Sequence, residues 1–215
     1  MDFKEGLKIA VSILEKSGIF KGDWTFGGGT ALMLYFNHRK SKDIDIFFHN
    51  PQFITMLTPR LNDYTYSITD RYTEQSNFLK LYFDDFEIDF IVAPNLTGLK
   101  PELKELNGME IYVDHPVEII AKKVYYRPYD IKIRDVIDLA VVYQHFPETV
   151  SIFKNRKIKP DINEIRLSIE RLRKADVKET LKELSLNKPI TEEEFKKYLS
   201  VFMDFIKRIE EDDAC

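Results

Sequence analysis

The stretch FGGGTALMLYFNHRKSKDIDIFF, residues 26–48, decides the fold prediction for this chain. It joins three glycines, a helix-like apolar run and two aspartates that lie two positions apart on an apolar strand. Side chains at i and i+2 of a β-strand share a face, so Asp43 and Asp45 project together while Ile44 and Ile46 turn towards a core. Two carboxylates on one face repel each other unless a cation joins them, which predicts a metal site.

The predicted cation is Mg²⁺, because this ion takes oxygen ligands from one or two carboxylates together with substrate phosphates. Upstream, the glycines allow the backbone to approach a phosphate closely, and Thr30 is expected to cap the following helix. We therefore expect Gly28, Gly29 and Thr30 to hold phosphates at the start of that helix. Phosphates beside metal-binding aspartates indicate nucleotide chemistry.

This segment resembles the first motif of the AbiEii/AbiGii-type nucleotidyltransferase toxins, a branch of the DNA polymerase β-like superfamily. The matching positions are the glycines, Thr30, Leu32, His38-Arg39, Ser41 and Asp43-Ile44-Asp45. The resemblance implies an α+β fold, a polymerase β-like mixed sheet with helices, followed by an α-helical C-terminal portion. It also implies the toxin of a toxin–antitoxin or abortive-infection system, with an antitoxin protein as partner. Some members of the family extend tRNA 3′ ends.

A third carboxylate is expected from a neighbouring strand, as polymerase β-like enzymes usually have one there. In FEIDFIV, residues 86–92, Asp89 stands between Ile88 and Phe90 in a setting much like that of Asp45. Glu87, two residues earlier on the same face, is the alternative. We expect Asp89 to bind the metal or to accept a proton from an attacking hydroxyl.

A second segment, VEIIAKKVYYRPYDIKIRDVIDLAVV at residues 117–142, resembles the later motif of the same family. The resemblance gives Lys123 the lysine position, Arg127 the arginine position and Asp138 that of the final acid. Lys123 and Arg127 would bind triphosphate charge, and Asp138 would orient one of them. Two alternatives stay open: Lys122 is the essential lysine, or the whole set is a buried salt-bridge cluster.

Some residues near these motifs allow two readings. His38 and Arg39 are expected either to touch phosphate or to lie on the surface. Tyr125, Tyr126 and Tyr129 could stack on a base or pack against neighbouring helices.

Hydrophobic periodicity predicts domains at residues 1–115 and 116–215. Helices are expected at residues 3–17, 30–36, 51–61, 117–126 and 134–146, and strands at 24–26, 42–48, 64–71, 78–83, 86–92 and 109–113. Residues 94–108 are rich in Pro, Gly and Asn and are expected to form a loop.

Composition limits the classes of partner. The chain has 215 residues, a net charge of −4 and a single cysteine at its last position, which predicts no intrachain disulfide and a cytoplasmic location. No apolar run reaches the length of a membrane span, so no membrane partner is expected. Lys and Arg exceed Asp and Glu over residues 154–174, which favours either a nucleic-acid acceptor or a solvated amphipathic helix. The resemblance implies RNA, and tRNA in particular, as the acceptor. The alternatives are a small-molecule nucleotidyltransferase of the antibiotic-modifying type and a non-catalytic protein that binds a nucleotide or a partner.

Overall fold

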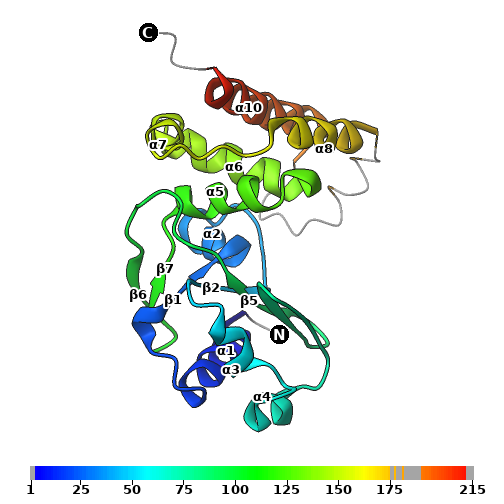
Figure 1. The fold of residues 1–215 in the computed structure, drawn as a ribbon. Coiled ribbons are helices and arrows are strands. Elements are labelled where there is room, and N and C mark those ends of the chain that lie inside the picture. Colours follow the sequence, from blue (N-terminus) through cyan, green and yellow to red (C-terminus); the bar gives the residue numbers. More distant parts are fainter. Residues whose placement is uncertain (1–2, 175–176, 178–180, 182–189, 212–215) are drawn as a thin grey trace. The chain divides into compact units, whose positions relative to one another are not determined.

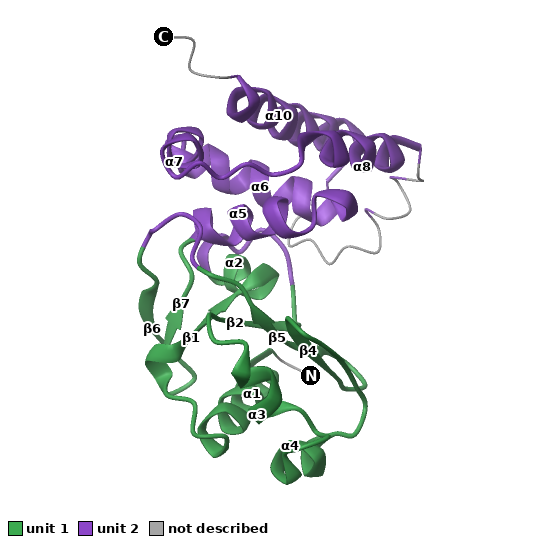
Figure 2. Cartoon of the chain, in the orientation of Figure 1, with its two compact units in different colours: residues 1–34, 41–94, 100–115 green, residues 35–40, 95–99, 116–215 purple. Residues whose placement is uncertain are grey.

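The computed structural model describes residues 3–174, 177, 181 and 190–211, and the chain divides into two compact units (Figure 2). Unit 1 comprises residues 1–34, 41–94 and 100–115, and unit 2 comprises residues 35–40, 95–99 and 116–215. Unit 1 carries the sheet and unit 2 is helical (Figure 1).

Unit 1 is built on a seven-stranded mixed sheet with the order β3-β4-β5-β2-β1-β7-β6. Its strands are β1 (Trp24–Gly27), β2 (Ile44–Phe48), β3 (Tyr72–Gln75), β4 (Phe78–Tyr82), β5 (Glu87–Val92), β6 (Glu102–Leu106) and β7 (Met109–Val113). The pairs β2–β5 and β1–β7 are parallel, and the other neighbours are antiparallel. This mixed sheet confirms the predicted α+β class.

Four helices accompany the sheet, namely α1 (Phe3–Lys16), α2 (Gly28–Phe36), α3 (Gln52–Leu57) and α4 (Asp63–Ile68), with the short 3-10 turn η1 (Lys21–Asp23). Helix α1 packs against β2 and β5 through an apolar stripe that includes Leu7 and Leu14. The alternate residues of the two central strands are fully buried, as Ile44, Ile46 and Ile88 show. Their neighbours in sequence, which include both predicted metal ligands of β2 and β5, therefore point to the other face of the sheet.

Two predicted elements of unit 1 were wrong. Residues 64–71 were expected to form a strand, but α4 occupies residues 63–68, because the side chain of Asn62 accepts the N–H of Thr65 at 3.0 Å and caps a helix. The expected loop at 94–108 contains β6. Asn107 and Gly108 have φ of 55° and 78° and join β6 to β7 in a two-residue turn, as this residue pair favours.

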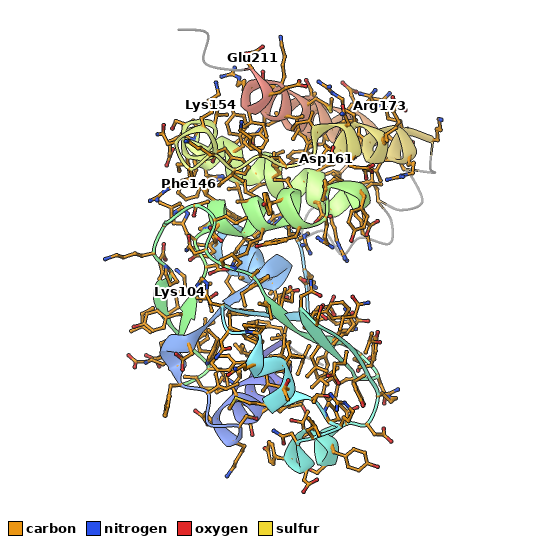
Figure 3. All side chains as sticks on the ribbon, viewed as in Figure 1. Lys104, Phe146, Lys154, Asp161, Arg173 and Glu211 are labelled. Carbon is orange, nitrogen blue, oxygen red and sulfur yellow. The ribbon has the colours of Figure 1, made fainter. Side chains whose placement is uncertain are left out.

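Unit 2 contains α5 (Pro116–Tyr126), η2 (Pro128–Asp130), α6 (Ile133–His145), α7 (Thr149–Asn155), α8 (Ile162–Lys174) and α10 (Glu192–Glu210). Helix α10 packs on α6 and α7, where Phe205 meets Phe153 edge-to-face at 5.1 Å (Figure 1). Arg173 lies on α8 and Lys154 on α7, and both are marked among the side chains of Figure 3. In the part of the chain that the structure describes, no helix is both long and apolar enough to span a membrane.

Candidate functional site

Strands β2 and β5 place the predicted carboxylates side by side. The strands are parallel, and Asp45 is the direct Cα partner of Asp89. Asp43 stands one residue before β2, and its Oδ1 accepts the backbone N–H of Glu87 at 3.3 Å. Asp43, Asp45, Glu87 and Asp89 therefore form two i, i+2 pairs in register on one face of the sheet, and we call them the acidic cluster. Asp89 and its alternative Glu87 both belong to it.

Lys80 on β4 supplies a positive charge to this cluster. It lies directly opposite Asp89, and its Nζ is 2.8 Å from Asp89 Oδ2 and 2.5 Å from Glu87 Oε2. Burial alone would lower the pKa of Lys80, but its hydrogen bonds to Asp89 and Glu87 raise it above the ordinary value. Lys80 therefore stays charged at all physiological pH values.

The pKa of Asp89 shows that this compensation is incomplete. Burial and the neighbouring charge of Asp45 raise the pKa of Asp89 to about 6, against the opposing effect of Lys80. Within this ion pair, the partners of Lys80 keep its ammonium group charged, whereas Lys80 does not bring the pKa of Asp89 back to its ordinary value. Lys80 has two carboxylates beside it, whereas Asp89 has a second carboxylate as well as an ammonium group.

The glycine turn is shaped around Asp45. Gly28 has a φ of 67°, and a Cβ added to it would lie 1.7 Å from Oδ2 of Asp45. Only glycine fits at this position, because both the left-handed backbone and the nearby carboxylate exclude a side chain. The conformation brings the first turn of α2, with its unpaired N–H groups, next to the acidic cluster.

Thr30 has a different role from the predicted one. Helix α2 begins at Gly28, so Thr30 lies within the first turn and the prediction that it caps the helix was wrong. Its side chain is fully buried, and Oγ1 donates to the carbonyl oxygen of Asp43 at 2.6 Å. Thr30 therefore anchors the residue that precedes β2. Phosphate binding by Gly28, Gly29 and Thr30 stays a prediction.

The acidic cluster has the donor chemistry that Mg²⁺ requires. Its oxygens are carboxylates, the ligands this ion prefers. Burial and then the charge of Asp45 raise the pKa of Asp89, so a nearby cation would favour its ionised form. As the side chains stand, no three His, Cys, Asp or Glu groups of the described residues form a ready metal site. Lys80 instead contacts two of the four carboxylates.

Unit 2 contains a second ionic cluster, centred on Asp138 of α6. The Asp138 carboxylate is fully buried and accepts Lys123 Nζ at 2.8 Å, Arg39 Nε and Nη2 at 2.7 and 2.8 Å, and a ring nitrogen of His38 at 2.7 Å. Burial alone would raise the pKa of Asp138, but Lys123, Arg39 and His38 hold it well below its usual range. Arg39 has only 6% of its side chain exposed, so it is not a surface residue.

Asp135 completes this basic cluster, which comprises His38, Arg39, Lys123, Arg127, Asp135 and Asp138. Asp135 Oδ1 is 2.6 Å from Lys123 Nζ and 3.4 Å from Arg127 Nη2. Burial would raise the pKa of Asp135, but the charges of Lys123 and Arg127 lower it. Three basic side chains, Arg39, Lys123 and Arg127, thus share two carboxylates, which leaves one formal positive charge in excess.

The two adjacent lysines of α5 have different surroundings. Lys123 contacts Asp135 and Asp138, whereas Lys122 is 5% exposed and its Nζ is 3.5 Å from Glu118. The Glu118 carboxylate accepts the N–H groups of Leu96 and Thr97, at 2.9 and 2.8 Å. Lys122 therefore belongs to a buried network that ties residues 95–99 to α5.

Sequence reasoning missed Lys80 and Glu118. Lys80 stands between Leu79 and Leu81, and the alternation of FLKLY already placed it on the polar face. Pairing that strand in a hairpin with FEIDFIV would have placed it near Asp89. Glu118 opens the E-x-x-x-x-K-x-x-x-R run of the second segment, but no local pattern indicated its role, because its partners are backbone N–H groups about twenty residues away.

Comparisons with known proteins concern the family and the fold. The family model for the nucleotidyl transferase AbiEii toxin of type IV toxin–antitoxin systems matches residues 13–212. MenT4, a nucleotidyltransferase toxin from Mycobacterium tuberculosis, is 15% identical with a TM-score of 0.55, and the match covers 95% of this chain and 82% of MenT4. JHP933 from Helicobacter pylori is 18% identical with a TM-score of 0.45, over 94% of this chain and 91% of the other. No curated protein matches the sequence.

Proposed function

Because the chain belongs to the AbiEii family of nucleotidyltransferase toxins, matched over residues 13–212, we propose that it transfers a nucleoside monophosphate from an NTP to a hydroxyl of RNA, with tRNA as the first candidate. Family membership makes the chain a nucleotidyltransferase toxin of a type IV toxin–antitoxin system, which implies an NTP substrate and an antitoxin partner. The acceptor, the metal ion, the residue roles and a cytoplasmic location are our proposals.

The observation that carries the proposal is the register of β2 and β5. It places Asp45 beside Asp89, and Asp43 beside Glu87, on one face of the sheet. In the proposed reaction, Asp43 and Asp45, with Asp89 as the third candidate ligand, would hold Mg²⁺, which would supply charge stabilisation at the phosphates. The first turn of α2 offers its N–H groups to phosphate oxygens.

The chemical step is a substitution at the α-phosphorus. The acceptor hydroxyl oxygen forms a bond to the α-phosphorus, the bond from that phosphorus to the bridging oxygen breaks, and pyrophosphate leaves. Asp89 lies beside Asp45 in the acidic cluster, and we propose that it either completes the metal site or takes the hydroxyl proton. We further propose that Lys123, oriented by Asp138, and Arg127 offset charge on pyrophosphate, because the basic cluster has one positive charge in excess.

The test uses each α-labelled NTP with Mg²⁺ and total RNA, and measures label transferred to RNA together with pyrophosphate released. Asp43→Asn should reduce transfer by at least about 100-fold, because it removes a ligand of the metal that stabilises the transition state. Asp70→Asn changes an exposed acid in the same unit and is the matched control. Label in a small-molecule extract but none in RNA would overturn the RNA acceptor, and unchanged transfer by Asp43→Asn would overturn the metal site.

A further inference from the structure

Three tyrosines at the end of α5 and in η2 are exposed. Tyr125, Tyr126 and Tyr129 have 41%, 39% and 59% of their surface accessible, and Tyr125 meets Tyr126 edge-to-face at 5.1 Å. These side chains are therefore only partly covered by their neighbours in unit 2. We call these three residues the tyrosine platform. Large aromatic rings that remain exposed to water are a common mark of a binding surface.

Helix α8 packs beside the platform within unit 2. Ser168 Oγ accepts the N–H of Ile131 at 2.8 Å, and Arg171 Nη2 donates to the carbonyl oxygen of Tyr129. Leu167, one turn before Arg171 on the same flank of α8, is also half exposed. The guanidinium of Arg171 is thus fixed at the edge of the platform. A carbonyl oxygen carries no full charge, so the positive charge of Arg171 stays available to an anion.

The charge around the platform is positive. Residues 125–132 and 168–174 together contain five basic side chains and two acidic ones. Lys132 and Asp130 form an exposed pair at 3.4 Å and Arg127 pairs with Asp135, which leaves Arg171, Arg173 and Lys174 against Glu170. A surface that combines flat rings with positive charge is complementary to a chain of bases joined by phosphates. A duplex fits it less well, because its bases are already stacked on one another.

We propose that the tyrosine platform and the adjoining end of α8 bind a single-stranded polynucleotide, with bases stacked on the rings and phosphates near Arg171. This inference rests on the proposed function in one respect, namely that the bound strand is the acceptor. Binding itself needs neither an NTP nor a metal, so the two claims can fail separately.

The experiment measures fluorescence anisotropy of labelled 12-nucleotide oligouridine, its deoxy counterpart and an RNA duplex on the full chain without NTP. Tyr129→Ala should weaken single-strand binding by about 5- to 150-fold, the range for loss of one stacked base. Tyr129→Phe keeps the ring and should bind like the unaltered protein. Tyr66→Ala is the matched control, because Tyr66 is 60% exposed on α4 in unit 1. Arg171→Gln should make the log–log salt slope shallower by about one.

Each result decides the matter. Tighter binding of either the RNA strand or the deoxy strand supports the platform and shows which of the two polymers it binds. Equal binding of the two strands supports stacking of the bases without recognition of the sugar. The proposal would be overturned if the duplex bound as tightly as the single strands or more tightly. It would also be overturned if Tyr129→Phe and Tyr129→Ala lost the same amount of binding, or if polyglutamate competed fully with the labelled strand. Label transfer to RNA that proceeds normally in Tyr129→Ala would separate the platform from the acceptor site. Absence of transfer with intact strand binding would instead count against the proposed function.

Discussion

Asp45→Asn should stabilise the metal-free protein at high pH, although the same change is expected to abolish nucleotide transfer. Asp45 and Asp89 are direct partners on adjacent parallel strands, which lie about 4.8 Å apart. Two unit charges about 5 Å apart repel by about 3 kcal/mol at an effective dielectric constant of about 20, and by about 0.8 kcal/mol in water. Removing the charge of Asp45 should therefore relieve about 1–3 kcal/mol when both groups are ionised.

The sign of the pH dependence follows from Asp89. Its pKa is about 6 in the folded protein, above the value of 3.8 for an unperturbed aspartate. The folded state therefore binds more protons than the unfolded state between these values, and stability falls as the pH rises from about 4 to about 6. The repulsion is fully present above about pH 6 and absent below about pH 4. Relative to the unaltered protein, Asp45→Asn should therefore be more stable above about pH 6 but not below about pH 4.

The assay is thermal unfolding in EDTA at about pH 8 and about pH 4. With about 2–4 °C for each kcal/mol in a chain of this size, the midpoint should rise by about 2–12 °C at the higher pH. Contacts of Asp45 that do not involve Asp89 affect both measurements, so the difference between the two pH values isolates the repulsion. Asp70→Asn serves again as the control. A gain at pH 4 equal to that at pH 8, or a loss confined to pH 8, would refute the argument.

Two further changes test the supports of the two clusters. Gly28→Ala should lower the free energy of unfolding, measured in urea, by at least about 2 kcal/mol and should impair transfer. The reason is that the left-handed backbone and the Asp45 carboxylate leave no space for a methyl group. An unfolding midpoint equal to that of the unaltered protein would contradict the close approach of Gly28 to Asp45. Asp138→Asn should cost about 3–5 kcal/mol in the same assay, since it leaves the charge of Lys123 without one of its buried partners. Asp204→Asn, which breaks an exposed pair on α10, should leave the midpoint nearly unchanged and is the matched control.

Local patterns were sufficient for much of unit 1. The alternation around Asp43 and Asp45 predicted β2, and the same alternation around Asp89 predicted β5, because both strands have one buried face. The pattern failed at residues 64–71, where aromatic and β-branched residues favoured a strand while the cap at Asn62 favoured the helix that forms. The turn at Asn107 and Gly108 was a readable hairpin signal that the composition of the surrounding segment obscured.

The contacts of the candidate site were beyond local reasoning. The register that pairs Asp45 with Asp89 depends on hydrogen bonds between strands more than forty residues apart, and either strand could shift without altering its own pattern. Likewise Arg39 meets Asp138 across 99 positions of sequence. The resemblance to a family named the residues, but only the structure shows that Asp138 receives Arg39 and Lys123 together.

Lys80 bears on how unit 1 tolerates four neighbouring carboxyls without a metal ion. Its ammonium group adds one positive charge, and it contacts Glu87 and Asp89. The pKa of Asp89 nevertheless stays raised to about 6, so a single ammonium does not offset the combined effects of burial and Asp45. The proposed divalent ion would supply the missing charge and favour the ionised carboxylates. Because Lys80 contacts only Glu87 and Asp89 of the four acids, the acidic cluster keeps a formal negative charge that a further cation would offset.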